Sequence, residues 1–261
     1  MKKNILLTGA SGFIGSNLLP KLKDYLVISW DIKDGYNIFD EELAGIIGSV
    51  DAVIHLAAET SVSGSFKNPD KHFTNNTMGT ARVAYLCQKY KKKLIFPSTG
   101  AYHFPELSPY AKSKYLAEEI VKTLTTPKVI LRFFNVYGPN MNPDSGSIMY
   151  NFLTKKEIVV FGSGEQTRDF INVDDVCEVI KASLSPRWNN KVVEVGTGQE
   201  YTINYVAELF AHYRGKKLYY HQSPKREIRW SIADTNMLKA LYRKPLTTDL
   251  ERDIQELVLN K

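Results

Sequence analysis

Three glycines near the start of the chain restrict the fold more than any other feature. Gly9, Gly12 and Gly15 stand three residues apart in "LLTGASGFIGSNLL", directly after an apolar run over 4–8 that is typical of a buried strand. Glycines in a strand-to-helix turn let the backbone approach a pyrophosphate, whose charge is favoured by the free N–H groups at the start of the helix. The sequence therefore predicts a dinucleotide-binding βαβ unit, with contacts from Gly9, Ser11, Gly12, Phe13, Ile14 and Gly15.

Short apolar runs and helical patterns alternate through the first half of the chain. The predicted strands cover 4–8, 26–31, 52–57, 94–97 and 129–133. Strands that alternate with helices favour right-handed βαβ units and a parallel sheet. We therefore predict an α/β fold, a Rossmann-type doubly wound parallel sheet with a smaller C-terminal α/β substrate-binding lobe. The expected cofactor domain is 1–135 with a later strand near 191–197, and 136–261 should mostly form the lobe.

Composition and charge argue against several classes of protein. With 261 residues, 43% of them hydrophobic and 24% charged, the chain matches an ordinary globular protein. Cys87 and Cys177 lack a Cys/His cluster, so we expect neither a disulfide framework nor a metal site. The basic clusters at 89–93, 214–217 and 225–229 resemble solvated helix ends, so we expect no nucleic-acid partner. The N-terminal apolar run is too short for a signal peptide and no membrane-spanning stretch follows, so we expect a cytoplasmic protein.

An acidic residue closes the second predicted strand at the position that selects the cofactor. Asp31 stands 22 positions after Gly9, where a carboxylate accepts hydrogen bonds from an adenosine ribose. A carboxylate at this position would repel a ribose 2'-phosphate, so NAD is favoured over NADP. Lys33 lies close by, and NADP stays possible if the protein is a reductase.

The stretch "IFPSTGAYHFPELSPYAKSK" over 95–114 holds a candidate catalytic group. Ser108 and Pro109 are typical of an N-cap and a first helical residue, so Tyr110 and Lys114 should share one face of a helix. A phenol with a pKa of about 10 needs its phenolate stabilised to act as a base, and a neighbouring ammonium and an oxidised nicotinamide can supply this. Ser98, at the end of a central strand, could orient the reacting oxygen. We predict Tyr110, Lys114 and Ser98 as catalytic residues.

Together these motifs resemble the extended short-chain dehydrogenase/reductases, specifically the NAD-dependent epimerase/dehydratase family that acts on nucleotide sugars. The resemblance continues through "HLAA", "NTMGT", "RFFNVYGP" and "FGSGEQTRDFINVDDV" and covers nearly the whole chain. It implies further cofactor contacts from Leu56, Ala57, Ala58, Asn76, Tyr110 and Lys114. It implies contacts to a nucleotide-diphosphate sugar from Ser98, Thr99, Asn135, Arg168 and Arg229. His55 would lie along the cofactor, although sequence alone favours a core imidazole, and the family also implies a homodimer.

The residues after Ser98 bear on which reaction of the family to expect. Family members oxidise a sugar carbon, usually C4, and differ in the step that comes after this oxidation. Dehydratases carry Asp-Glu directly after the catalytic Ser/Thr, whereas this chain has Thr99-Gly100. We therefore expect a nucleotide-sugar 4-epimerase serving polysaccharide biosynthesis, with a 4-ketoreductase using NAD(P)H and a non-catalytic dinucleotide sensor as alternatives. The segment between Ser98 and Tyr110 is shorter than in most relatives, which predicts a more open sugar pocket.

Overall fold

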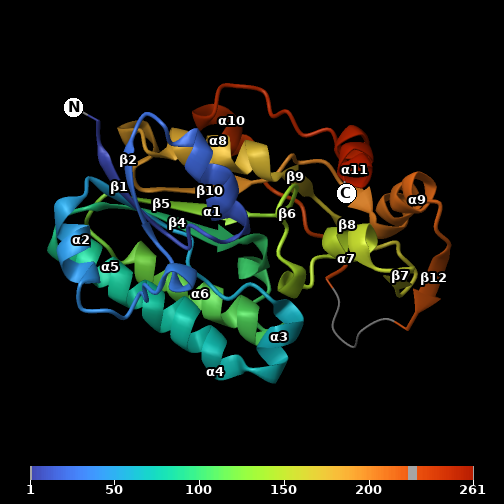
Figure 1. The fold of residues 1–261 in the computed structure, drawn as a ribbon, viewed down its shortest axis with the longest axis horizontal. Coiled ribbons are helices and arrows are strands. Elements are labelled where there is room, and N and C mark those ends of the chain that lie inside the picture. The colour runs from blue at the N-terminus through green and yellow to red at the C-terminus, as the bar shows by residue number, and fades with distance from the viewer. Residues whose placement is uncertain (1, 223–227, 261) are drawn as a thin grey trace.

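A six-stranded parallel sheet forms the centre of the computed structural model, which describes residues 2–222 and 228–260 (Figure 1). The strand order is β10-β5-β4-β3-β1-β2. The strands are β1 (Asn4–Thr8), β2 (Leu26–Trp30), β3 (Ala52–His55), β4 (Lys93–Thr99), β5 (Lys128–Phe133) and β10 (Lys191–Val195). The order reverses beside β1 and β3, which is where open parallel sheets bind ligands. This architecture confirms the predicted fold class.

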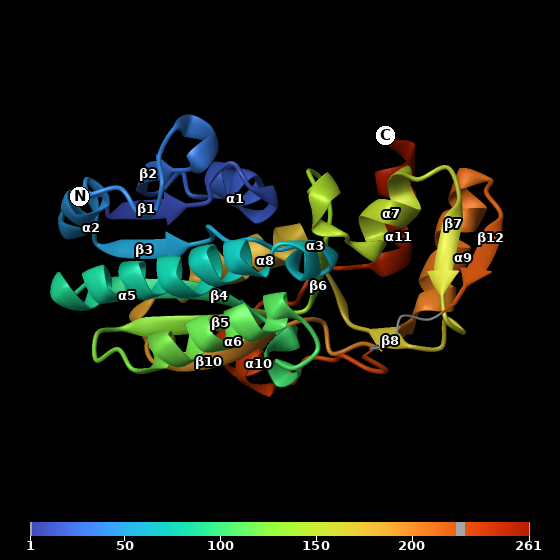
Figure 2. The same cartoon turned by 90° about the horizontal axis from the view of Figure 1, so that it is seen from below.

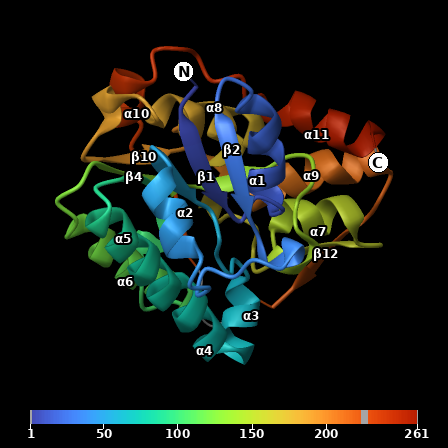
Figure 3. The same ribbon diagram turned by 60° about the vertical axis from the view of Figure 1, so that its left-hand side comes forward.

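Helices cover both faces of the sheet, each over a separate apolar core (Figures 1 and 3). One face carries α1 (Phe13–Leu18), α8 (Val173–Ser183) and α10 (Asn236–Leu241). The other carries α2 (Leu43–Ser49), α5 (Gly79–Lys89) and α6 (Pro109–Lys122), with α5 and α6 side by side in Figure 3. The short helices α3 (Val62–Lys67) and α4 (Pro69–His72) lead through a π-helical turn over Phe73–Met78 into α5. We refer to the sheet and these helices as the body.

The remaining elements form a smaller unit beyond the carboxyl ends of the sheet strands (Figure 2). It contains three two-stranded sheets, β6–β9, β7–β12 and β8–β11, around an apolar core of its own. Its strands are β6 (Asn135–Tyr137), β7 (Ile158–Phe161), β8 (Thr167–Arg168), β9 (Phe170–Asn172), β11 (Tyr201–Thr202) and β12 (Leu218–His221). Its helices are α7 (Ile148–Thr154), α9 (Ile203–Arg214) and α11 (Leu250–Leu259). We refer to these elements as the lobe.

Helix starts follow the local sequence closely. The Ser108 side chain caps α6 by accepting the Ala111 N–H, and Pro109 is its first residue, which confirms the predicted start of that helix. Most of the predicted basic cluster at 225–229 lies outside the described residues. Within the described ranges, the structure has no helix both long and apolar enough to cross a membrane.

Candidate functional site

A cleft of about 1290 Å³ opens at the carboxyl ends of the sheet strands and runs between body and lobe. At one end it is lined by the glycine turn that follows β1, and at the other by Arg168 of the lobe. Tyr110 and Lys114 also line it. Most of the predicted cofactor, catalytic and substrate residues therefore share a single continuous cleft.

The glycine turn is packed too closely to hold side chains. Gly9 has φ +70°, and a Cβ there would lie 2.6 Å from the Ala57 backbone nitrogen. A Cβ on Gly15 would overlap the Gly9 carbonyl oxygen. Gly12 is the N-cap of α1 and offers no side chain to the first N–H groups of that helix, which have no partner inside the helix. The turn thus leaves backbone donors beside the cleft, and Phe13 and Ile14 line it as well.

Asp31 lies on the cleft at the end of β2, held by backbone donors. Its carboxylate accepts the N–H of Ser11 and the N–H of Lys33, each at 2.9 Å. Ser11 itself is not among the residues that line the cleft, and its hydroxyl donates to Asp34. The structure therefore places Ser11 as a support for Asp31.

The loop after β3 brings Leu56, Ala57 and Ala58 to the cleft. His55 is buried, lies within hydrogen-bonding distance of the hydroxyls of Thr8 (2.8 Å) and Thr80 (3.2 Å), and does not line the cleft. Burial, reinforced by the charge of Lys114, lowers the pKa of His55 to about 3. His55 is thus a neutral imidazole in the core, which is the interpretation that the sequence alone favoured.

Asn76 does not reach the cleft in the described structure. Its amide exchanges hydrogen bonds with the backbone of Glu59, at 2.8 and 3.0 Å, and donates to Ser113 Oγ at 3.0 Å. These contacts fix the cleft-lining Glu59 loop to α6. We expected Asn76 to contact the cofactor ribose. In the structure its side chain instead contacts Glu59 and Ser113.

Tyr110 and Lys114 lie in the first turns of α6. Lys114 is buried, donates to the Pro97 carbonyl at 2.7 Å and packs over the Phe96 ring at 4.3 Å. Burial lowers the pKa of Lys114 to about 7, although the carboxylate of Glu118 opposes this. Burial also raises the pKa of Tyr110, with a hydrogen bond from Thr99 acting in the opposite direction. Among the protein's own groups, burial is therefore the largest influence on the pKa of the phenol.

Ser98 lines the cleft, but its hydroxyl is engaged elsewhere. Ser98 Oγ donates to Glu118 Oε2 at 2.6 Å, and Glu118 is paired with Arg132 at 2.7 Å. The next residue, Thr99, also lines the cleft, and its Oγ1 accepts the Ala101 N–H at 3.2 Å. The structure thus binds the Ser98 hydroxyl, which was expected to orient the reacting oxygen, to a carboxylate of α6.

Two of the three predicted substrate residues of the lobe reach the cleft. Asn135 lines it and donates through Nδ2 to the Asp169 carbonyl at 2.9 Å. Arg168 lines it, with Nη1 donating to the carbonyls of Thr167 and Ile228. Arg229 has an exposed side chain outside the cleft lining, and its carbonyl accepts the Thr167 N–H. The structure therefore leaves Arg229 apart from the other two.

Apolar residues that the motifs did not single out line the cleft beside Tyr110. They come from α3 and from the short segment over 100–108. They are Val62, Phe66, Ala101, Phe104 and Leu107. Val62 and Phe66 are 47% and 58% exposed. The sequence pointed to these residues only through their positions, because they stand in short segments that precede or follow predicted motifs.

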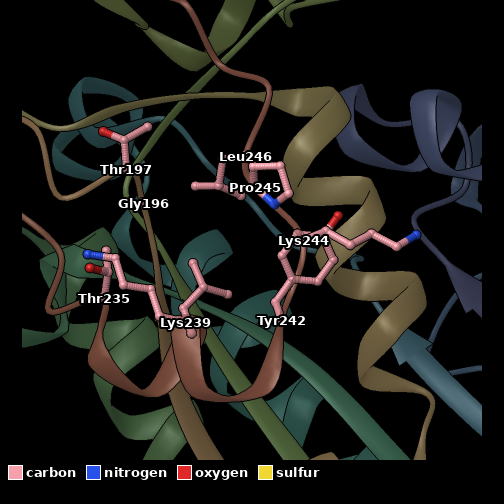
Figure 4. Close-up of a pocket in the computed structure, with 9 residues that line it drawn as sticks. Gly196, Thr197, Thr235, Lys239, Tyr242, Lys244, Pro245 and Leu246 are labelled. Carbon is pink, nitrogen blue, oxygen red and sulfur yellow. The ribbon is translucent and has the colours of Figure 1, made fainter.

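A second, smaller cavity of about 220 Å³ lies beside α10 (Figure 4). Thr197, Thr235, Lys239 and Tyr242 are among the residues around it. It shares no lining residue with the large cleft and contains none of the predicted site residues.

The fold and the cleft define a dinucleotide-binding protein with a tyrosine and a lysine one helical turn apart beside the cofactor path. Comparisons with known proteins specify the class further. The model of the NAD dependent epimerase/dehydratase family matches residues 5–196. The chain belongs to that family, which confirms the resemblance seen in the motifs.

Individual relatives match over nearly the whole chain. A Methanocaldococcus jannaschii protein, whose name of UDP-glucose 4-epimerase is provisional, is 32% identical over 300 aligned positions that cover 97% of each chain. The UDP-glucose 4-epimerase of Thermotoga maritima, solved with UDP-glucose, has a TM-score of 0.86 at 30% identity, covering 98% of this chain and 97% of that one. A mutant UDP-glucuronic acid 4-epimerase of Bacillus cereus, solved with NAD and a fluorinated UDP-sugar, has a TM-score of 0.88 at 27% identity, covering 98% and 99%.

Proposed function

We propose that the protein is a nucleotide-sugar 4-epimerase that uses NAD. The observation that carries this proposal is the continuity of the cleft, which passes from the glycine turn and Asp31, past Tyr110 and Lys114, to Arg168. A dinucleotide on the body and a nucleotide sugar against the lobe would meet at Tyr110. Relatives named as UDP-glucose and UDP-glucuronate 4-epimerases, at 32% and 31% identity, support the same assignment.

The residues of the body fit a dinucleotide. A side chain on Gly9 would collide with the Ala57 backbone, so glycine is required at this turn. A pyrophosphate would approach the free backbone N–H groups of the turn, and Asp31 would accept the adenosine ribose hydroxyls. The chemistry that NAD supplies when bound is removal of a hydride from the sugar carbon and its return. We further propose that 1–135, with the strand near 191–197, is the NAD-binding domain and that 136–261 mostly binds the nucleotide sugar.

Tyr110 would act on the proton of the sugar C4 hydroxyl. It accepts that proton while the carbon becomes a ketone, and gives it back when the hydride returns to the opposite face. Lys114 has a pKa of about 7 and therefore exists in both forms near neutral pH. In its charged form it favours the phenolate of Tyr110 one helical turn away. Arg168 offers a cation near the far end of the cleft, suited to the diphosphate of the substrate.

The residues beside Tyr110 favour epimerisation over dehydration. A 4,6-elimination needs an acid and a base beside the sugar, and Thr99 and Gly100 occupy the two positions after Ser98 where dehydratases carry Asp-Glu. A Cβ at Gly100 would lie 2.9 Å from the Phe134 ring, so that position is closed to a larger side chain. Neither residue supplies a titratable group for elimination.

The experiment has two parts. First, the purified protein is denatured and the released nucleotide identified; stoichiometric NAD supports an epimerase that recycles its hydride. Second, the protein is incubated with UDP-, dTDP-, CDP- and GDP-sugars and the products are followed by NMR for inversion at C4. A protein that holds no nucleotide and consumes NADPH with a 4-keto sugar would be a ketoreductase and would contradict the proposal.

We also propose a homodimer formed through α5 and α6. Met78, just before α5, and Tyr85 on α5 are 60% and 63% exposed, and residues seven positions apart share one face of a helix. Analytical ultracentrifugation of the wild type and of Tyr85→Glu tests this, since the variant should sediment as a monomer. An unchanged sedimentation coefficient would place the dimer contact elsewhere or exclude it.

A further inference from the structure

The cleft beside Tyr110 has two unlike sides. On one side Ser98 and Thr99, at the end of β4, bring hydroxyl groups to the lining. The other side is formed by α3, which packs against α6, and by the segment over 100–108, which leads directly into α6. We refer to the four large apolar residues of this second side as the apolar wall: Val62, Phe66, Phe104 and Leu107.

Short-range hydrogen bonds hold the apolar wall in place. The Ser61 side chain caps α3 by accepting the Gly64 N–H at 3.0 Å. The N–H groups of Phe104 and Leu107 each donate to the carbonyl three residues earlier, at 3.0 and 3.1 Å. Even so, Phe66 is 58% exposed. A ligand that covers this side chain with apolar atoms gains the free energy of its burial.

The loop before α3 places a negative charge next to the apolar wall. Glu59 lines the cleft three residues before Val62, and its side chain is 29% exposed. Its carboxylate pairs with Lys71 at 3.0 Å and accepts Nδ2 of Asn75 at 3.0 Å. Lys71 does not line the cleft, so the pair adds no cation to the lining. A second carboxylate at this point would be repelled.

The cations of the cleft lie away from the apolar wall or are engaged. Within the described residues, the lining has three basic side chains, those of Lys33, Lys114 and Arg168. Lys33 lies beside Asp31 at the cofactor end, and Arg168 lies at the lobe end. Lys114 is buried and donates to the Pro97 carbonyl. A sugar carboxylate against the apolar wall would therefore lose its hydration without gaining a partner.

The reacting carbon determines which part of a sugar meets the apolar wall. With C4 at Tyr110, the neighbouring ring atoms are C3, which carries a hydroxyl, and C5, which carries C6. A sugar hydroxyl needs a hydrogen-bond partner when it leaves water, and the side of the cleft at the end of β4 can provide one. C6 then faces the apolar wall.

We propose that the apolar wall and Glu59 select nucleotide sugars whose C6 group is neutral, and reject nucleotide uronates, in which C6 is a carboxylate. Phe66 and Glu59 are then specificity-determining residues. The inference rests on the proposed function, because it takes C4 as the carbon held at Tyr110. A methyl group at C6 leaves no polar atom on the apolar wall, so 6-deoxy sugars should bind best.

The first experiment varies only C6. UDP-glucose, UDP-6-deoxyglucose and UDP-glucuronate, and the same three sugars on dTDP, are titrated by calorimetry into the protein supplied with NAD. Turnover of each is followed by NMR. Within one nucleotide series, the 6-deoxy sugar should bind about threefold more tightly than glucose, because no hydroxyl is desolvated. The uronate should bind at least about tenfold more weakly than glucose.

The second experiment changes the charge of this side of the cleft. Phe66→Lys puts a cation on the apolar wall at an exposed position, and Glu59→Gln removes the negative charge. Each should raise the affinity for glucuronate relative to glucose by about fivefold. Leu26→Lys is the matched control, because Leu26 is 56% exposed and lies outside the cleft lining. Its affinity ratio should equal that of wild type.

Glucuronate binding as tightly as glucose in the wild type would overturn the inference. An unchanged affinity ratio in both Phe66→Lys and Glu59→Gln would do the same. Calorimetry needs no turnover, so failure of the inference can be told apart from failure of the proposed function. Inversion of glucose and glucuronate at C4 with equal kcat/KM would keep the epimerase and overturn the selection at C6. Tighter binding of the neutral sugars with no inversion at C4 would contradict the epimerase and keep the selection.

Discussion

Lys114 and His72, on either side of Tyr110 in the chain and in the body, are buried with few partners, whereas the buried Asp169 of the lobe has many. Beside the cleft, Lys114 donates to one carbonyl, and the buried His72, whose ring meets that of Tyr110 edge-on, has no partner for Nδ1 within the described part of the chain. At the lobe, Asp169 accepts four hydrogen bonds, from Thr197 N and Oγ1 and from the N–H groups of Gly198 and Ala233.

This contrast separates groups that serve chemistry from groups that hold the structure together. A buried group with few partners is poorly stabilised in its charged form, so its pKa moves and it can exchange protons near neutral pH. A buried carboxylate with every oxygen occupied stabilises the chain around it and is unavailable to a substrate. Burial alone therefore does not identify a catalytic residue.

The largest effect is expected from Tyr110→Phe. General-base assistance accounts for about a hundred- to ten-thousand-fold in rate, so turnover should fall by about a thousandfold. The phenol is not a donor that the fold depends on, so the free energy of unfolding should change by less than about 1 kcal/mol. Rates come from NMR of the sugar product and stability from urea denaturation. Retained turnover would remove Tyr110 from the mechanism.

Asp169→Ala should mainly lower stability, whereas Tyr110→Phe should mainly lower turnover. It leaves three backbone N–H groups without an acceptor, so the free energy of unfolding should fall by about 3 kcal/mol, while NAD binding to the body persists. Urea denaturation and NAD titration measure the two effects. Asp24→Ala, which removes an exposed ion pair to Lys181, is the control and should leave the stability close to that of wild type. Equal losses in both variants would contradict the structural role of Asp169.

Lys114→Met tests whether burial with few partners shifts the pKa of Lys114, through the pH dependence of the unfolding free energy. The pKa of Lys114 is about 7 in the folded chain and about 10.4 when unfolded. As pH falls from about 10 to about 7, the unfolded wild type therefore takes up a proton that the folded one does not, and wild-type stability falls relative to the variant. The difference in unfolding free energy should change by roughly 3 to 4 kcal/mol across this window, measured by denaturation at several pH values. A difference that stays constant would show that Lys114 is not held neutral.

The smallest effect is expected from His72→Phe. The ring contact with Tyr110 is kept, while the buried nitrogen without a partner is replaced by carbon. Because such a nitrogen costs about 1 kcal/mol or more, the variant should be as stable as wild type or slightly more so, with turnover within a few-fold. Thermal unfolding and product NMR measure both. A large loss of turnover would mean that the imidazole nitrogen takes part in the reaction.

Local features of this protein could be predicted from sequence, and long-range hydrogen bonds could not. The glycine turn and the start of α6 depend on residues a few positions apart, so their patterns sufficed. Asn76 was expected at the cofactor because nothing in its motif shows that Glu59 and Ser113 occupy its amide. The hydroxyl of Ser98 is taken by Glu118, 20 residues away, and only the folded chain shows that contact.

The position of β10 has a consequence for how the polypeptide is made. β10 completes the sheet beside β5, yet the segment over 134–190, which contains α8 and part of the lobe, separates the two strands in the chain. On a ribosome that adds about 5–20 residues per second, β5 is an open edge for roughly 3 to 12 seconds before β10 emerges. Such an edge is a template for pairing with other chains. Nascent or prematurely terminated chains that end before Val195 should therefore depend on chaperones to stay soluble.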